Sequence, residues 1–91
     1  MDFEWDEAKS ERNGVERRLP FEVAIELFDG LVVERADRRQ DYGEVRHQAV
    51  GQVRGKTLFC VYTDRGMTRR IISLRYANRR ERDAYRAAQP G

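Results

Sequence analysis

The sequence predicts an α+β fold with two N-terminal helices, an antiparallel sheet of about four strands and a C-terminal helix. Two observations lead to this prediction. Apolar residues in the first third of the chain recur at helical spacing, whereas residues 44 to 75 consist of strand-like segments separated by two turn signals. The chain has 91 residues, which is enough for one modest core, so we expect a single domain spanning residues 1–91.

The N-terminal part is expected to begin with a small strand at Phe3-Glu4-Trp5, followed by two helices. Asp6 is a good N-cap for a helix from about Glu7 to Asn13, and the glycine that follows signals its end. Pro20 suits the first position of a second helix, which Asp29-Gly30 ends. The apolar stripe of the second helix consists of Phe21, Ala24, Ile25 and Phe28.

The remainder of the chain is expected to form four strands and a last helix. Leu31-Val32-Val33 begins the first strand, and a polar loop from Asp37 to Gly43 follows it. The other strands span Glu44 to Val53, Thr57 to Thr63 and Arg69 to Arg75, with turns at Arg54-Gly55 and around Gly66. Asn78-Arg79-Arg80-Glu81 is a capping pattern that opens a helix running to about Ala88, before Pro90.

Charge is distributed unevenly between the two halves of the chain. Residues 1–44 carry 7 Lys/Arg against 13 Asp/Glu, while residues 45–91 carry 11 against 3. The stretch from Arg65 to Arg80 holds six arginines and no carboxylate, and 16 of the 18 basic residues are arginine. Arginine forms bidentate pairs with phosphate, so this pattern favours a phosphate-binding surface. The alternative is an arginine preference of a GC-rich genome, combined with pairing to the acidic half.

Hairpin geometry predicts which charged residues meet. A turn at Arg54-Gly55 places Arg46 opposite Thr63 and Glu44 opposite Arg65, all on one face of the sheet. The next hairpin, turning near Gly66, places Arg69 beside Thr63, or Arg70 if the register slips by one residue. We call this set the arginine cluster; it comprises Glu44, Arg46, Thr63, Arg65 and Arg69 or Arg70.

The rest of the predicted sheet divides into a core face and a continuation of the basic surface. Arg75 shares the face of the cluster but lies ~20 Å from Arg69 along the strand, where it can hold the next stretch of a bound nucleic acid. Tyr76 stacks on a base, donates a proton or packs under the last helix. Arg79 and Arg80 form a solvated face, a phosphate track or a partner contact. The core face is expected to contain Val45, Ala49, Leu58, Cys60, Tyr62, Ile72 and Leu74.

Several classes of protein are disfavoured by composition. A single cysteine precludes an internal disulfide, and one His with one Cys does not make a zinc site, so we expect no metal and no cofactor. No apolar stretch approaches the ~20 residues of a membrane span, and the N-terminus lacks a signal pattern. We therefore expect a cytoplasmic protein without membrane contact.

The order and spacing of short motifs along nearly the whole chain carry a family resemblance. They comprise Phe3-Glu4-Trp5-Asp6 with Lys9 and Asn13; Phe21, Ala24 and Phe28-Asp29; Gly43-Glu44 with Arg46 and Gly51; Tyr62-Thr63 with Arg65; Arg70-Ile71-Ile72-Ser73 with Arg75 and Ala77; and Glu81 with Tyr85. With these motifs the chain resembles the BrnT family of bacterial type II toxins. It departs from the family at Arg17-Arg18-Leu19-Pro20, where members commonly have Lys-His-Gly-Val, and at Leu74, where they usually have Ala.

The resemblance implies a RelE-like fold, endoribonuclease activity that inhibits translation, and a cognate BrnA-like antitoxin that holds the toxin inactive. It further implies that operator DNA is contacted only through the antitoxin. Metal-independent RNA cleavage needs a base near the 2′-hydroxyl and positive charge around the phosphate. Arg46, Arg65 and Arg69 or Arg70 would supply the charge.

Glu44 is the best candidate for the base, although an ordinary ion pair with Arg65 and Arg46 would explain the same carboxylate and lower its pKa. His47 is expected to point toward the core beside Tyr62. Two other functions remain open: a non-catalytic module that binds RNA or an acidic partner, and a subunit whose acidic and basic halves bind each other in a homo-oligomer.

Overall fold

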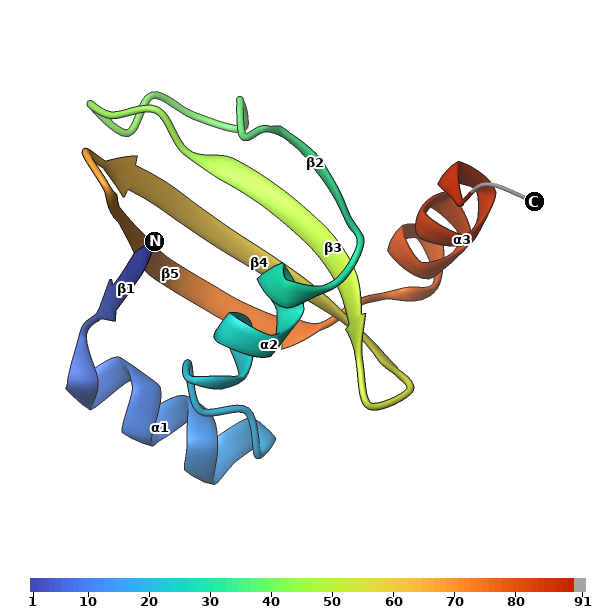
Figure 1. Ribbon diagram of the computed structural model, residues 1–91, viewed down its shortest axis with the longest axis horizontal. Coiled ribbons are helices and arrows are strands. Elements are labelled where there is room, and N and C mark those ends of the chain that lie inside the picture. The colour runs from blue at the N-terminus through green and yellow to red at the C-terminus, as the bar shows by residue number, and fades with distance from the viewer. Residues whose placement is uncertain (90–91) are drawn as a thin grey trace.

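The computed structural model describes residues 1–89 and contains five strands and three helices (Figure 1). The elements are β1 (Asp2–Trp5), α1 (Glu7–Arg17), α2 (Val23–Asp29), β2 (Val32–Ala36), β3 (His47–Val53), β4 (Lys56–Arg65), β5 (Thr68–Tyr76) and α3 (Arg79–Ala88). The α+β class and the order of the elements are confirmed. Pro90, expected beyond the end of α3, lies outside the described residues.

All five strands belong to one sheet in the order β1-β5-β4-β3-β2. The strands from β2 to β5 are antiparallel neighbours, and the predicted turn at Arg54-Gly55 gives the predicted register, with Val53 opposite Lys56 and His47 opposite Tyr62. The leading strand β1 pairs with β5 in parallel, so the sheet is mixed rather than wholly antiparallel. No helix among residues 1–89 is long and apolar enough to cross a membrane.

Helix α1 continues one turn beyond the end predicted at Asn13. Asp6 is the N-cap as expected, and its carboxylate accepts a hydrogen bond from the Lys9 amide at 3.1 Å. Instead of ending the helix, Asn13 donates from its side-chain amide to the carbonyls of Leu19 and Leu74 at 2.6 and 2.9 Å. The helix ends at Arg18, which adopts the left-handed conformation with φ of 56°. Asn13 thus ties α1 to β5.

Helix α2 is shorter than predicted and buries a different residue. Pro20 lies in the turn before the helix, which begins only at Val23. Leu27 is fully buried, whereas Ile25, predicted to lie in the apolar stripe, is 43% exposed. A Cβ at Gly51 would lie 2.7 Å from Leu27 Cδ1, so the glycine allows α2 to approach β3 closely.

A β-bulge in β5 changes the predicted alternation of side chains. Val61 pairs with Ser73, but the next residue of β4, Tyr62, pairs with Ile71, so Ile72 has no partner. Ile71 is consequently the buried isoleucine, where Ile72 had been predicted. Val45 is also wrong as a core residue, because β3 begins only at His47 and Val45 is 68% exposed. The confirmed core-face residues are Ala49, Leu58, Cys60, Tyr62 and Leu74.

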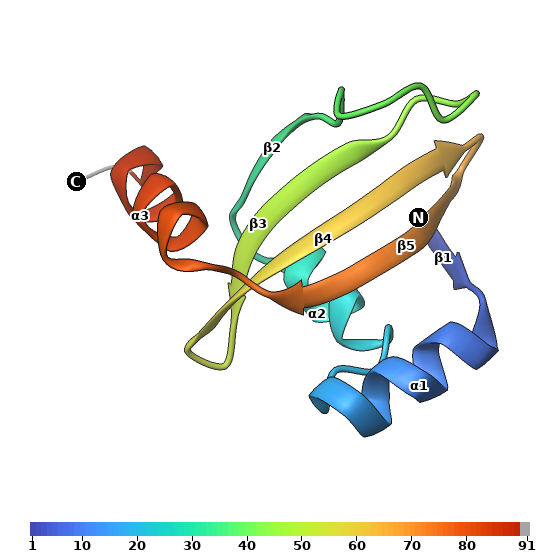
Figure 2. The same cartoon turned by 180° about the vertical axis from the view of Figure 1, so that it is seen from behind.

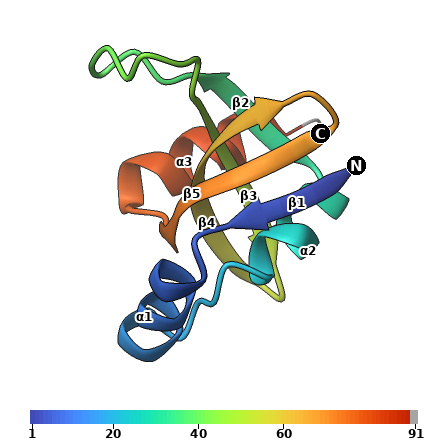
Figure 3. The ribbon, with the colours of Figure 1, turned by 90° about the vertical axis from the view of Figure 1, so that its left-hand side faces the viewer.

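The helices cover opposite faces of the sheet (Figure 3). Helices α1 and α2 lie on the core face, and α3 lies over one end of the other face, which we call the outer face (Figure 2). The outer face carries Phe59, Val61 and Thr63 of β4, which alternate with the core residues of that strand. The predicted capping box of α3 is present between Asn78 and Glu81.

Candidate functional site

Three members of the arginine cluster meet as predicted at the end of the sheet near the β4–β5 turn. The Glu44 carboxylate accepts hydrogen bonds from Arg65 at 3.3 Å and from Arg46 at 3.4 Å. Glu44 and Arg46 lie in the β2–β3 loop rather than in a strand, and this loop approaches the β4–β5 turn in Figure 1. The Arg46 guanidinium lies 4.1 Å from the centre of the Tyr42 ring.

The β2–β3 loop is fixed to the sheet by buried hydrogen bonds. The Thr63 hydroxyl donates to the Val45 carbonyl at 2.6 Å, and the Asp37 amide donates to the Arg46 carbonyl at 2.8 Å. Asp37 is itself buried, and Arg39 donates to its carboxylate at 2.7 and 2.8 Å. Thr63 is only 3% exposed, and its hydroxyl holds the loop in position.

Glu44 has the properties expected of a carboxylate in an ion pair. The hydrogen bond from Arg65 is the main cause that lowers its pKa, with a further contribution from Arg46. Both hydrogen bonds are longer than the usual 2.7–2.9 Å of charge-assisted bonds. Glu44 therefore balances the arginines without holding them tightly.

Arg70, and not Arg69, belongs to the cluster. Thr63 pairs with Arg70 in the ladder, because the hairpin turns at Gly66-Met67 with Arg65 opposite Thr68. The predicted register with Arg69 beside Thr63 is therefore wrong by one residue, and the alternative with Arg70 is the one observed. Arg70 lies on the outer face with one weak partner, Glu4, at 3.6 Å.

Arg69 faces the core side and is firmly held there. Its guanidinium donates two hydrogen bonds to Asp64, at 2.8 and 3.0 Å. It also lies 4.6 Å from the centre of the Phe28 ring and 4.1 Å from that of the Tyr62 ring. Only 14% of the Arg69 side chain is exposed, so a ligand on the outer face does not reach it.

Arg69 is part of a polar network on the core face that sequence reasoning did not find. The Tyr62 hydroxyl donates to Glu34, and the His47 ring stacks on Tyr62 at 5.3 Å, which confirms the predicted inward position of His47. Burial, with Glu34 as a second cause, raises the pKa of Tyr62, while Arg69 lowers that of Asp64. Side chains alternate between the two faces along Val33-Glu34-Arg35. With the β2–β3 pairing known, this alternation places Glu34 on the core face.

At the other end of the outer face, Arg75 is also firmly held. It forms two hydrogen bonds of 2.8 Å with Glu81 of α3, and its guanidinium lies 4.0 Å from the centre of the Phe59 ring. Arg75 is the main cause that lowers the pKa of Glu81. Arg79 and Arg80 are exposed on α3.

Tyr76 does not join the arginines of the outer face. It pairs with Leu58, a core-face residue, and lines a small cavity of about 190 Å³ beside the turn between α1 and α2. It is 45% exposed. Neither the predicted packing under α3 nor a place on the basic surface is observed.

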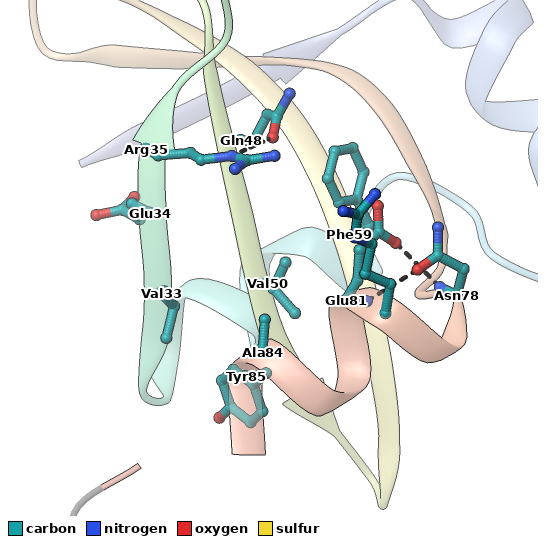
Figure 4. Close-up of a pocket in the computed structure, with 11 residues that line it drawn as sticks. Val33, Glu34, Arg35, Gln48, Val50, Phe59, Asn78, Glu81, Ala84 and Tyr85 are labelled. Atoms are coloured by element: carbon teal, nitrogen blue, oxygen red, sulfur yellow. Dashed lines mark hydrogen bonds between the residues drawn. The ribbon is translucent and has the colours of Figure 1, made fainter. Parts of the chain in front are cut away.

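A pocket of about 520 Å³ lies on the outer face between strands β2, β3 and β4 and helix α3 (Figure 4). Arg35 and Gln48 enter its lining from β2 and β3, and the Arg35 Nε donates to the Gln48 Oε1 at 2.9 Å. Sequence reasoning missed both residues because the pairing of β2 with β3, which brings Arg35 beside Gln48, was not predicted. Within residues 1–89, no group of three or more His, Cys, Asp or Glu side chains is arranged to hold a metal ion.

These features define a small α+β protein with a basic sheet face and a pocket, an arrangement typical of proteins that bind a polyanion. A comparison with models of protein families identifies the family. Residues 5–81 match the model of the family described as "Ribonuclease toxin, BrnT, of type II toxin-antitoxin system". The chain belongs to this family, so it is a ribonuclease toxin whose substrate is RNA and whose partner is an antitoxin. A comparison with curated proteins gave no match.

Proposed function

We propose that the chain is a metal-independent endoribonuclease that cleaves RNA at the outer face of the sheet, with Arg46, Arg65 and Arg70 around the scissile phosphate. One observation carries this proposal. These three arginines have carboxylate partners only at 3.3 to 3.6 Å, so a phosphate with its stronger bidentate geometry can replace the carboxylates.

Replacement of the Glu44 carboxylate by a phosphate would also provide a general base. When a phosphate takes Arg46 and Arg65, Glu44 loses the hydrogen bonds that lower its pKa, and its basicity rises beside the bound ribose. The released carboxylate would accept the proton of the 2′-hydroxyl as that oxygen attacks the phosphorus. The bond from phosphorus to the 5′-oxygen would break, and the departing 5′-oxygen would take up a proton from solvent water. The arginines would stabilise the charge of the pentavalent phosphate. Arg80, which is exposed on α3, would contact the RNA further along the outer face, and Arg75 would hold α3 in place there through Glu81.

The test is to incubate the purified chain with deproteinised RNA in EDTA and to follow cleavage over time. We expect Arg46→Ala and Arg65→Ala to slow cleavage about 100- to 1000-fold, and the Glu44→Gln rate to show whether that carboxylate acts as the base. Arg54→Ala is a matched control, since Arg54 is an exposed arginine with a weak partner, Glu26, on the β3–β4 hairpin. Wild-type rates in both cluster variants would contradict the site, and cleavage that requires added Mg²⁺ would contradict metal independence.

We further propose a cognate BrnA-like antitoxin that covers the outer face, and contact with operator DNA through that antitoxin alone. The family supports an antitoxin, and the position of the arginines on one face supports a single covered surface. Because the substrate is RNA, the proposed place of action is the cytoplasm. We expect induction of the wild type to arrest growth, and co-expression of the antitoxin to relieve the arrest. Induction of Arg46→Ala should not arrest growth.

A further inference from the structure

The pocket under α3 combines an apolar floor with charged groups at its edge. The floor is formed by Val33, Val50, Phe59 and Ala84, and α3 is held over it by the Tyr85 hydroxyl, which donates to the Leu31 carbonyl at 3.0 Å. A volume of about 520 Å³ lies within the ~300–1,000 Å³ range of small-molecule sites. A flat heterocycle with a polar edge suits this combination.

Among the charged groups that line the pocket, the guanidinium groups outweigh the free carboxylates. Of its two carboxylates, Glu81 is neutralised by Arg75, and Glu34 points away from the pocket in Figure 4 and accepts from Tyr62 on the other face. Among residues 1–89, neither Arg35 nor Arg80 forms an ion pair. The pocket thus offers two guanidinium groups to an electron-rich ligand.

Arg35 is oriented before any ligand binds. Its Nε is held by Gln48, which is 5% exposed and therefore cannot move freely. The two terminal nitrogens of Arg35 form no hydrogen bond with residues 1–89, so the guanidinium has donors left for a ligand. In nucleic-acid recognition an arginine most often uses such a fork to bind O6 and N7 of guanine.

The pocket is also close to the proposed cleavage site. Gln48 pairs with Val61 in the sheet, two residues before Thr63, which is opposite Arg70. Two residues of a strand correspond to about 7 Å along β4. A base in the pocket would accordingly belong to a nucleotide near the scissile phosphate.

We propose that this pocket binds one guanine base of the RNA, read by the Arg35 fork and placed on the apolar floor, and so determines where the chain cuts. The proposal rests on the proposed ribonuclease function. Gln48 is a positioning residue that orients Arg35, while Arg80 at the rim contacts the RNA backbone.

The experiment maps cleavage ends in a random RNA library, cut by the wild type, Arg35→Lys, Gln48→Leu and the control Arg12→Lys. Arg12 is an exposed arginine of α1 on the core side, far in the fold from the outer face. We expect the wild type and the control to prefer guanine at one fixed position, by about 10- to 100-fold. Arg35→Lys, which keeps the charge but lacks the fork, and Gln48→Leu should lose this preference. Replacing guanine by 7-deazaguanine should reduce the preference of the wild type and of the Arg12→Lys control, and should change little in Arg35→Lys and Gln48→Leu.

A second measurement tests guanine binding independently of the proposed ribonuclease activity. Short 2′-O-methyl RNAs, which lack the attacking hydroxyl, differ only in one central base, and their binding is followed by fluorescence anisotropy. Guanine-selective binding that Arg35→Lys abolishes supports the pocket even if no RNA is cut.

Four outcomes would overturn the inference. Cleavage or binding by the wild type without base preference would do so, as would a preference unchanged in Arg35→Lys. A uniform loss of affinity for all four bases in Arg35→Lys would assign Arg35 to the phosphate backbone instead. Unchanged RNA selection with weakened antitoxin binding would assign the pocket to the antitoxin.

Discussion

Arg69 and Arg70 are adjacent in the sequence but occupy opposite faces of the sheet with opposite properties. Arg69 lies between two aromatic rings on the core side and forms short hydrogen bonds to Asp64. Arg70 lies on the outer face with one carboxylate at 3.6 Å. An arginine that is already saturated contributes to folding, while one with a weak partner remains available to a phosphate. From these pairing distances we infer that Arg69 has a structural role and that Arg70 is available to the proposed site.

Removing Arg70 tests its role in the proposed site and carries the largest expected effect. Arg70→Ala should lower the rate of RNA cleavage about 100- to 1000-fold, because it removes one donor from the charged transition state. Its pair with Glu4 lies at the surface and stabilises the fold by less than about 1 kcal/mol, so the melting temperature should change little. Single-turnover cleavage assays and thermal unfolding by circular dichroism measure the two quantities. A large drop in melting temperature would contradict the assignment.

Removing Arg69 should give the reverse result. Arg69→Ala removes contacts with two rings and leaves Asp64 without its partner, at a cost of about 2 kcal/mol in the free energy of unfolding. For a domain of this size, that corresponds to a melting temperature lower by about 10 °C. Cleavage per folded molecule should stay within a few-fold of the wild type at a temperature where the variant is folded. If Arg69→Ala were as stable as the wild type but inactive, the division of roles between the two arginines would fail.

The difference between these neighbours shows what the sequence could and could not predict. The turn at Arg54-Gly55 determined the β3–β4 register, and with it the Glu44 to Arg65 contact, because a two-residue turn leaves one pairing. The β5 register was ambiguous because Ile71 and Ile72 are equally apolar and either can be buried. The turn at Gly66-Met67 places Ile71 opposite Tyr62, and the bulge at Ile72 lets Leu74 face the core as well, a combination that periodicity does not report.

The pocket could be predicted even less well. Its walls come from β2, β3, β4 and α3, and the position of α3 depends on long-range contacts such as the hydrogen bond from the Tyr85 hydroxyl to the Leu31 carbonyl. The capping box of α3 was predictable because it involves residues three positions apart. Local signals thus gave the elements, while the relation between their surfaces required the structure.

Replacing Glu81, the partner of the firmly held Arg75, should have a smaller effect that depends on pH. Its pKa is lowered mainly by Arg75, so the pair stabilises the fold above the ordinary glutamate pKa of about 4.3 and loses this contribution as the pH falls through the lowered value. Glu81→Gln should cost about 1–2 kcal/mol at pH 7 and less at pH 3. Urea unfolding of the wild type and the variant at both pH values measures the difference in their free energies of unfolding.

The control for Glu81 is Asp83→Asn, which removes only exposed pairs at 3.8 and 4.0 Å. It should change the free energy of unfolding by less than about 0.5 kcal/mol at either pH. A Glu81→Gln deficit that is the same at pH 7 and pH 3 would show that its charge is not what stabilises α3.

The bulge itself provides the test with the smallest expected effect. Deleting one isoleucine of the Ile71-Ile72 pair leaves a regular strand in which the remaining isoleucine pairs with Tyr62 and Ser73 still pairs with Val61. Arg69 should then stay on the core face and Arg70 on the outer face, because the deleted residue is the one without a partner. We expect a loss of about 1 kcal/mol from the half-buried side chain and cleavage within about tenfold of the wild type. Loss of folding would show instead that the sheet requires the bend that the bulge introduces into β5.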